Sequence, residues 1–563
     1  MINRSLLLLV LSFLLLAGNG WGATYYVDQA GGNDSNPGTT PVNAWKTISK
    51  VSSSSFSGGD SVLFKRGETW KEQLEVTSSG STGNPITFGA YGSGASPVIS
   101  GGRTIASGSW TANDPVGGVW SYATYNRYFL YEDSVPLKHA SSSSCTDGNW
   151  FSDSGKVYYK PTTGTLTDHV VELYASNGIH LQNNSYVTID GIAFRKSQYG
   201  ISNYPARGQK SSYITVRNCT FTNNFNALGI RTNDALSSMI IISNNTFDYN
   251  GKSIFVGGIG GDTEIYFNNT DNVRIDNNTV NHCSEVYKAI GYDWSSASDG
   301  VDVEGIGVQN LINSNIYKNT ISGACRGIVL YASTNNESYN NNIYQNRVET
   351  ARGGMFLIPF REATSYYNNN VYYNVILNSG ALDGGSRNAA VILGNVNSPS
   401  IKYNNFFNNT ICCSQNGMYV MPPTGHTDAF WRVENNIFYK PTGRHILESP
   451  SSTNMLYNYN LYYPDTAKSF YVGADKTFAL WKAIDSVRDN NSPVPADPLF
   501  ISATNFRLQV TSPARDAGTD VGLASDFLGN SVPFGSAPDI GAYEYISSSK
   551  GPSPPSNLRI IYR

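Results

Sequence analysis

The sequence has little charge and no basic block. Only 14% of its 563 residues are charged, and the formal net charge is −3. Nucleic-acid-binding domains gather lysine and arginine on one face or in one segment, so no nucleic acid is expected as a partner. After the N-terminus, no segment approaches the roughly 20 apolar residues that a membrane helix needs. We therefore expect no membrane span in the mature protein.

One apolar run does stand at the start of the chain. It extends from Leu6 to Ala17, follows the single positive charge of Arg4, and leads into small residues up to Ala23. This order is typical of a secretory signal peptide, and we predict cleavage after Gly22. The alternative is an uncleaved membrane anchor. The signal predicts a secreted protein, whether extracellular, periplasmic or on the cell surface, and we expect it to be a monomer.

A short sequence motif recurs from about residue 187 onward. It reads apolar, any residue, apolar, one or two polar residues, asparagine, any residue, apolar. A spacing of about 20 to 45 residues fits one coil of a solenoid, and the alternating pattern predicts strands. The residue two before the last apolar position serves as a marker, and it recurs at Ile192, Cys219, Asn245, Asn278, Asn319, Asn346, Asn374, Asn409, Asn436 and Asn460.

The repeat predicts parallel strands stacked coil upon coil, at about 4.8 Å per coil. One coil cannot bury its own apolar face, whereas ten or more bury a continuous core. Asparagine tolerates the left-handed region at a tight bend and bonds its own backbone, and its amides can bond one another through the stack as a ladder. Glycine near the start of the next strand is expected to permit a sharp corner, as at Gly200, Gly229, Gly327, Gly354 and Gly417.

Cysteine is scarce, and its six positions fit no zinc pattern. Cys283 and Cys325 would face each other on neighbouring coils, either as a disulfide or as buried thiols. The adjacent Cys412 and Cys413 are not expected both to have structural roles.

Several stretches outside the repeat carry distinctive motifs. They are Tyr25–Gly38 with Trp45–Ile48, then Gly59–Gly67, and near the C-terminus Asp497–Phe500, Phe506–Leu508, Ser512–Ala514 and Asp539–Tyr545. Together with the repeats, these motifs resemble the pectate-lyase-like superfamily over residues 24–546. The resemblance implies an all-β fold, a single-stranded right-handed parallel β-helix with an N-terminal cap and a closing C-terminal module. It also implies a polysaccharide partner, although the fold hosts lyases, hydrolases, epimerases and non-catalytic proteins.

The resulting organisation has six parts. They are a signal peptide (1–22), an N-terminal cap with the first coils (23–105), an insertion of short strands and loops (106–180), the regular helix (181–465), the closing module (466–546) and a disordered Ser/Pro-rich tail (547–563).

Acidic residues gather in the widest spacing of the repeat, between Asn278 and Asn319. Asp302 and Glu304 stand two apart and so share one side of a strand, and Asp299 lies just before them. Carboxylate oxygens of this kind are ligands for Ca²⁺. An acid and base pair of a glycoside hydrolase and solvated loop charges remain the alternatives.

Arginine and aromatic residues lie close to this acidic group in the repeat. Arg326 and Arg352 precede glycines one coil apart, and Arg361 follows on the next coil. Arginines along one face suit an acidic glycan, while surface ion pairing is the alternative. Tyr292 and Trp294 are candidates for stacking on sugar rings.

A lyase that acts on a uronate must neutralise the carboxylate and remove the neighbouring proton. The order of Asp302, Glu304 and then Arg326 is similar to that of alginate and chondroitin lyases of this fold. Those enzymes carry a lysine shortly after the acidic pair, where this chain has Gln309. A lyase would therefore need Lys288 or Lys318 in its place, and Lys288 is the predicted base.

The motifs of polygalacturonase-type hydrolases are absent apart from a rearranged Thr232-Asn-Asp234. We therefore predict a lyase for an acidic polysaccharide, with Glu304 and Arg326 in its site. A glycoside hydrolase or a non-catalytic polysaccharide-binding protein of the same fold is the alternative.

Overall fold

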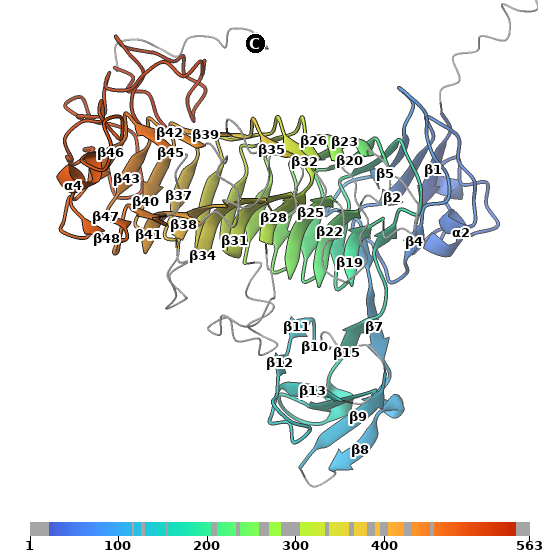
Figure 1. Cartoon of the computed structure of the whole chain (residues 1–563). Helices are drawn as coiled ribbons and strands as arrows, with labels where there is room; N and C mark the ends of the chain where they lie inside the picture. The colour runs from blue at the N-terminus through green and yellow to red at the C-terminus, as the bar shows by residue number, and fades with distance from the viewer. Residues whose placement is uncertain are drawn as a thin grey trace, which may run out of the picture.

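The computed structural model is almost entirely β (Figure 1). Its only α-helices within the described residues are α2 (Ile48–Ser52) and α4 (Phe478–Lys482). No helix among those residues has the length and hydrophobicity needed to cross a bilayer. The structure describes residues 22–114, 117–124, 130–153, 155–203, 211–231, 237–257, 270–282, 304–332, 337–359, 365–379, 389–394, 404–421, 431–450 and 455–547.

The first wall of the molecule is a sheet of 16 strands, nearly all paired in parallel from one coil to the next. Val187 pairs with Ile214, which pairs with Ile240, so the apolar positions of the repeat lie above one another. Its strands are β1 (Thr24–Val27), β2 (Ser61–Lys65), β5 (Ile86–Tyr91), β17 (Val187–Asp190), β20 (Ile214–Arg217), β23 (Ser237–Ser243), β26 (Thr270–Asp276), β29 (Leu311–Ile312), β30 (Asn315–Tyr317), β32 (Glu337–Tyr339), β33 (Asn342–Tyr344), β35 (Ser365–Tyr367), β36 (Asn370–Tyr372), β39 (Asn404–Phe407), β42 (Trp431–Glu434) and β45 (Met455–Asn458).

A second sheet of 23 strands bends around a corner and forms two further walls. The second wall contains β3 (Thr69–Trp70), β6 (Val98–Ser100), β18 (Ala193–Arg195), β21 (Thr220–Thr222), β24 (Thr246–Asp248), β27 (Thr279–Asn281), β37 (Val375–Leu377), β40 (Thr410–Cys412), β43 (Ile437–Tyr439) and β46 (Leu461–Tyr463).

The third wall runs beside it and includes the ends of two long strands that turn the corner, β31 (Thr320–Ala332) and β34 (Arg347–Pro359). Its other strands are β4 (Leu74–Glu75), β16 (Ile179–His180), β19 (Tyr199–Ser202), β22 (Asn226–Arg231), β25 (Lys252–Gly257), β28 (Glu304–Gln309), β38 (Ala389–Leu393), β41 (Asn416–Val420), β44 (Ile446–Glu448) and β47 (Phe470–Val472), and the antiparallel β48 (Ala474–Lys476) follows β47.

The core between the walls is continuous from coil to coil. Phe194, Phe221 and Phe247 stack with ring centroids 5.0 and 4.6 Å apart, and all three are fully buried. The predicted parallel β-helix is therefore confirmed, and its coils bury a shared core that no single coil could form.

The asparagine ladder is also confirmed. The side-chain amide of Asn245 donates to the amide oxygen of Asn278 at 3.0 Å, and Asn278 donates to Asn319 at 3.0 Å. The same bond continues through the remaining markers at 2.9 to 3.1 Å, from Asn319 to Asn346, Asn374, Asn409, Asn436 and Asn460.

Two details of the turns differ from prediction. The left-handed residue is the one before each marker, as at Asn244 and Lys318, because that residue reverses the chain and lets the marker amide point inward. The corner glycines do not have positive φ. They provide space instead, since a Cβ on Gly327 would lie 2.3 Å from Cγ1 of Val348, and one on Gly354 would lie 2.3 Å from Cγ2 of Ile376.

The insertion contributes two small sheets that hang below the N-terminal half of the stack (Figure 1). The first contains β10 (Leu130–Glu132), β11 (Val135–Pro136) and β15 (Val171–Tyr174), together with β7 (Gly102–Ile105), which lies just before the predicted start of the insertion at residue 106. The second contains β8 (Thr111–Asp114), β9 (Val119–Ala123), β12 (Lys138–His139), β13 (Asn149–Asp153) and β14 (Lys156–Lys160). Short 3₁₀ helices lie at Pro41–Asn43, Ser107–Ser109 and Leu166–Asp168.

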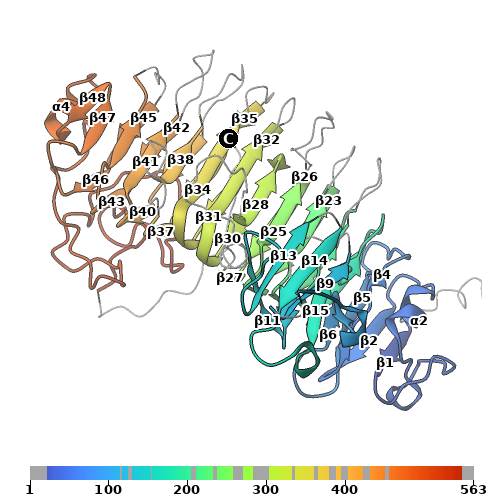
Figure 2. The same cartoon turned by 90° about the horizontal axis from the view of Figure 1, so that it is seen from below.

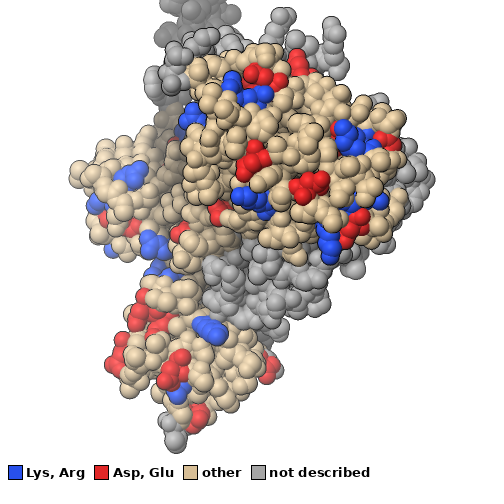
Figure 3. All heavy atoms as spheres, turned by 90° about the vertical axis from the view of Figure 1, so that its left-hand side faces the viewer, with Lys and Arg blue, Asp and Glu red and all other residues tan. Residues whose placement is uncertain are grey.

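The closing module folds back against the second wall. Phe506 and Ile540 of the module join Val375, Ile437 and Leu461 of the wall in one buried apolar cluster. The C-terminal end of the stack shows acidic and basic side chains scattered singly, without a patch of one sign (Figure 3).

The cysteines give one surprise. Cys412 and Cys413 are joined to each other in a disulfide, although both were not expected to be structural. Cys145 and Cys219 are free and buried. Cys283 lies outside the described residues and the side chain of Cys325 is not described, so their pairing stays a prediction. The signal and nearly all of the tail also lie outside the described residues.

Candidate functional site

The third wall has an apolar outer face. Ile328, Leu330, Met355 and Leu357 point into the main core, and the residues that alternate with them therefore point outward. These outward residues form a separate cluster of buried Val329, Phe356, Ala389 and Ile392 with half-buried Tyr331, Ile358, Tyr419 and Met421. Figure 2 shows this sheet from below, where the strands of the wall follow one another along the stack.

Glu304 and Arg326 meet at one edge of this outer face. Glu304 begins β28 and is only 4% exposed. Its register partner on the next strand is Arg326 of β31. The two were predicted to lie on neighbouring coils of one site, and the structure places them side by side.

Arg326 is held by aromatic neighbours. Its Nη1 donates to the hydroxyl of Tyr331 at 2.7 Å, and its guanidinium carbon lies 4.8 Å from the centroid of the Phe356 ring, a cation–π distance. Gly353, the register partner of Arg326, has no side chain, and a Cβ there would lie 2.2 Å from the Phe356 ring. The glycine thus leaves room for the ring on which Arg326 rests.

Tyr331 is a residue that the sequence reasoning missed. It is the register partner of Gln309, the position at which the resemblance led us to look for a lysine. The alternation of Ile328, Val329, Leu330 and Tyr331 along β31 was the available signal, because it places the tyrosine on the outer face.

Most other predicted site residues lie outside the described residues. Arg352 belongs to β34, but its side chain is not described. Of the three predicted Ca²⁺ ligands only Glu304 is described, and one carboxylate is far from the six to eight oxygens that Ca²⁺ takes. Ca²⁺ therefore stays a prediction. The predicted site residues that lie outside the described residues are Lys288, Tyr292, Trp294, Asp299, Asp302 and Arg361.

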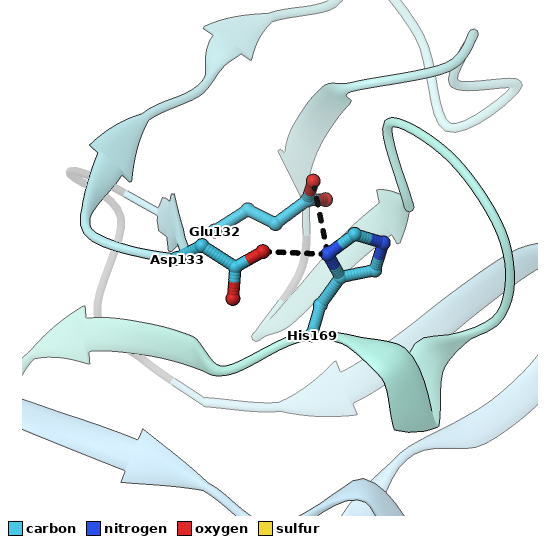
Figure 4. Close-up of side chains that lie close together, drawn as sticks. All are labelled: Glu132, Asp133 and His169. Carbon is cyan, nitrogen blue, oxygen red and sulfur yellow. Dashed lines mark hydrogen bonds and ion pairs between the residues drawn. The ribbon is translucent and has the colours of Figure 1, made fainter.

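The insertion holds a second cluster of ionisable groups, Glu132, Asp133 and His169 (Figure 4). Nδ1 of His169 lies 2.7 Å from Oδ2 of Asp133 and 3.4 Å from Oε1 of Glu132, and Nε2 lies 2.7 Å from the carbonyl oxygen of Thr163. Both ring nitrogens face acceptors, and the hydrogen bonds to Asp133 and Thr163 raise the pKa of His169. The raised pKa favours the protonated imidazole, which pairs with the two carboxylates and has no lone pair to offer a metal.

A cavity of about 340 Å³ lies where the insertion joins the stack. We call it the junction cavity. Lys71, Arg195 and Lys196 of the stack line it, together with Asp133 and Glu172 of the insertion. No sequence pattern pointed to it, because its residues come from segments that lie far apart in the sequence, from Thr69 to Lys196.

A family model and one solved structure support the fold. Residues 177–388 match the family model described as right handed beta helix region. The chain is a right-handed parallel β-helix protein. Among solved structures, the complex of XylC with xylose aligns with 93% of this chain and 98% of its own, with a TM-score of 0.55 and 13% identity. The pectate lyase Pel9A covers 94% of this chain and 97% of its own at 13% identity, with a TM-score of 0.39.

One curated relative matches in sequence. It is the lacto-N-biosidase of Bifidobacterium longum subsp. longum, which is 28% identical over 205 residues. The match covers 35% of this β-helix protein and only 12% of the relative's length.

Proposed function

We propose that this β-helix protein is a secreted lyase that cleaves a uronate-containing polysaccharide on the outer face of the third wall. The observation that carries the proposal is the fixed group of Arg326, Tyr331 and Phe356. The guanidinium of Arg326 is oriented by the ring of Phe356 and by the hydroxyl of Tyr331. A planar, always charged guanidinium is suited to pair with the carboxylate of a uronate.

The chemistry follows from that pairing. Neutralising the carboxylate makes the proton on C5 of the sugar easier to remove. Tyr331 acts as the phenolate, which has lost its own proton to water and which the Arg326 N–H stabilises, and its oxygen takes the C5 proton. The C4–O bond then breaks, a C4–C5 double bond forms, and the Tyr331 hydroxyl returns its proton to the leaving oxygen, which regenerates the phenolate. Lys288, predicted as the base, remains an alternative for this step.

The outer face offers the rest of a glycan site. Tyr419 and Met421 continue the half-buried apolar cluster beyond Phe356. Sugar rings present C–H faces that pack on aromatic side chains, and Tyr331, Phe356 and Tyr419 supply such side chains along the wall. An apolar face that extends over several coils suits a polymer better than a small molecule.

Hydrolysis is the second candidate, because the relative matched in sequence is a lacto-N-biosidase. In that case Glu304 would act as one of the two carboxylates that glycosidases use. A non-catalytic polysaccharide-binding protein is the remaining reading.

One assay separates the three. The purified protein is incubated with a panel of uronate polymers, with and without Ca²⁺, while ultraviolet absorbance of the unsaturated product and new reducing ends are both followed. Rising absorbance supports the lyase, reducing ends alone support the hydrolase, and neither supports binding.

Site variants make the test specific. We expect Arg326→Ala and Tyr331→Phe each to lower kcat/KM by about 10²–10⁴-fold, the range of a lost acid–base group. Arg432→Ala is the matched control, since Arg432 also rests on a phenylalanine ring, 5.0 Å from Phe407, but on the first wall. An equal loss in the control would contradict the proposed site.

A further inference from the structure

The junction cavity lies at the corner between the second and third walls. Lys71 follows β3, and Lys196 follows β18, so both lie where the chain passes from one wall to the other. Lys196 is only 6% exposed and Glu172 only 4%. The cavity volume of about 340 Å³ is at the small end of ligand sites, which span roughly 300–1,000 Å³.

Its charges do not balance. Glu172 accepts hydrogen bonds from both Lys71, at 2.7 Å, and Lys196, so one carboxylate serves two ammonium groups. Asp133 is already paired with His169.

The third cation adds to this excess. Arg195 is exposed and makes no ion pair with any residue that the structure describes. The lining therefore carries three cations against two carboxylates, an excess of one positive charge. An excess of this sign favours an anionic ligand.

Polar groups stand beside the cations. The Nζ of Lys196 donates to the hydroxyl of Ser134 at 3.0 Å, and the Nζ of Lys71 donates to the hydroxyl of Thr104 at 2.8 Å. The hydroxyl of Thr104 donates to Glu172 at 3.5 Å, whereas the hydroxyl of Ser134, which lines the cavity, can turn its proton toward a ligand oxygen. Charged and neutral donors next to one another match a sugar that carries a carboxylate.

We propose that the junction cavity binds one acidic sugar residue through its carboxylate, with Arg195 and Lys71 as the ligand-facing cations. The substrate class rests on the proposed function. The same corner carries Arg326 four coils further on, through the successive pairings of β18, β21, β24, β27 and β31. Four coils correspond to about 19 Å, so a polymer held at the cavity can reach the cleavage site.

Calorimetric titration with galacturonate tests this inference directly. It is done at low ionic strength, where surface charges are least screened, and in the Arg326→Ala protein so that the proposed catalytic site is disabled. We expect saturable binding of galacturonate and none of galactose. Arg195→Ala added to this background should raise Kd at least tenfold, and Arg195→Lys should restore part of the affinity.

Arg217→Ala is the control, because Arg217 is an exposed arginine one coil on that pairs with Asp190 at 2.8 Å away from the cavity. It should bind galacturonate as the parent does. The inference is overturned if the Arg326→Ala protein binds no galacturonate, or if Arg195→Ala binds it unchanged. Either result leaves the proposed cleavage intact. Conversely, if the protein binds galacturonate but cleaves no polymer, the proposed lyase activity is wrong and the proposed binding site in the junction cavity is supported.

Discussion

The insertion and the closing module both dock on the β-helix, but they use their carboxylates in opposite ways. The insertion meets the stack at Glu172, which lies between Lys71 and Lys196. The closing module meets the second wall through an apolar cluster and keeps its own carboxylates inside. Glu544, for example, accepts hydrogen bonds from the backbone N–H groups of Phe534 and Asp539, both at 2.9 Å.

The difference shows in the titration of the two regions. Burial opposes the charge of Glu172, but the hydrogen bonds and charges of Lys196 and Lys71 outweigh burial and lower its pKa. In the closing module burial dominates, raising the pKa of Asp539 to about 6 and that of Glu544 to about 7. The ionised carboxylate of Glu172 therefore holds the insertion on the stack. Ionisation of Asp539 and Glu544, in contrast, destabilises the closing module.

The largest expected effect is at the contact of Glu172 with Lys71 and Lys196, which we call the ionic joint. Glu172→Ala leaves Lys196 buried without its carboxylate, and breaking a buried pair in this way costs about 3–5 kcal/mol. We expect the insertion to undock, with faster hydrogen exchange in β7 and β15 and a lower free energy of unfolding in urea. Asp147→Ala removes an ion pair to Lys160 in which Asp147 is 68% exposed, and it should cost less than about 1 kcal/mol. Equal losses in the two variants would show that the joint is not ionic.

A smaller effect is expected at the apolar cluster between the closing module and the second wall, which we call the apolar joint. Ile540 is fully buried in the cluster of the closing module, and truncating such a side chain to alanine costs about 3 kcal/mol. Ile540→Ala should speed hydrogen exchange in residues 497–545 while β7 and β15 stay protected. Ile501, which is 52% exposed, provides the control Ile501→Ala. Faster exchange in the insertion of the Ile540→Ala protein would mean that the two appendages are coupled through the stack.

The sequence predicts the parts that repeat. From Asn245 to Asn460 the marker is asparagine in each coil, so one local rule, that equivalent amides bond each other, places Asn245 next to Asn278 across 33 residues. The corner glycines show the limit of such a rule. Gly354 makes space for Ile376, and that contact depends on how tightly two walls meet, which no local pattern contains.

The appendages and the site are not repeated, and they were harder to predict. Glu304 and Arg326 could be paired from the coil spacing alone. The joint of Glu172 with Lys71 could not, because the two residues are 101 positions apart and the intervening chain leaves the stack and returns. Tyr331 was missed because its role depends on where the side chain of Arg326 turns after the corner.

The smallest expected effect separates the two joints by pH alone. A raised folded pKa contributes stability below the unfolded value, near 4, and loses it as pH rises through the folded value. The closing module should therefore loosen between pH 5 and 8, as Asp539 and Glu544 ionise at about 6 and about 7. Glu172 has a lowered pKa, so its contribution is complete above the unfolded value and is lost only in more acidic solution.

Hydrogen exchange corrected for its intrinsic pH dependence measures both regions in one sample. From pH 5 to pH 8 we expect the closing module to lose protection progressively, as Asp539 and Glu544 ionise at about 6 and about 7, while β7 and β15 stay constant. Glu544→Gln should flatten the response of the closing module, because an amide does not ionise. A closing module that tightens as pH rises would mean that the backbone N–H groups around Asp539 and Glu544 outweigh their burial, and the contrast between the two joints would disappear.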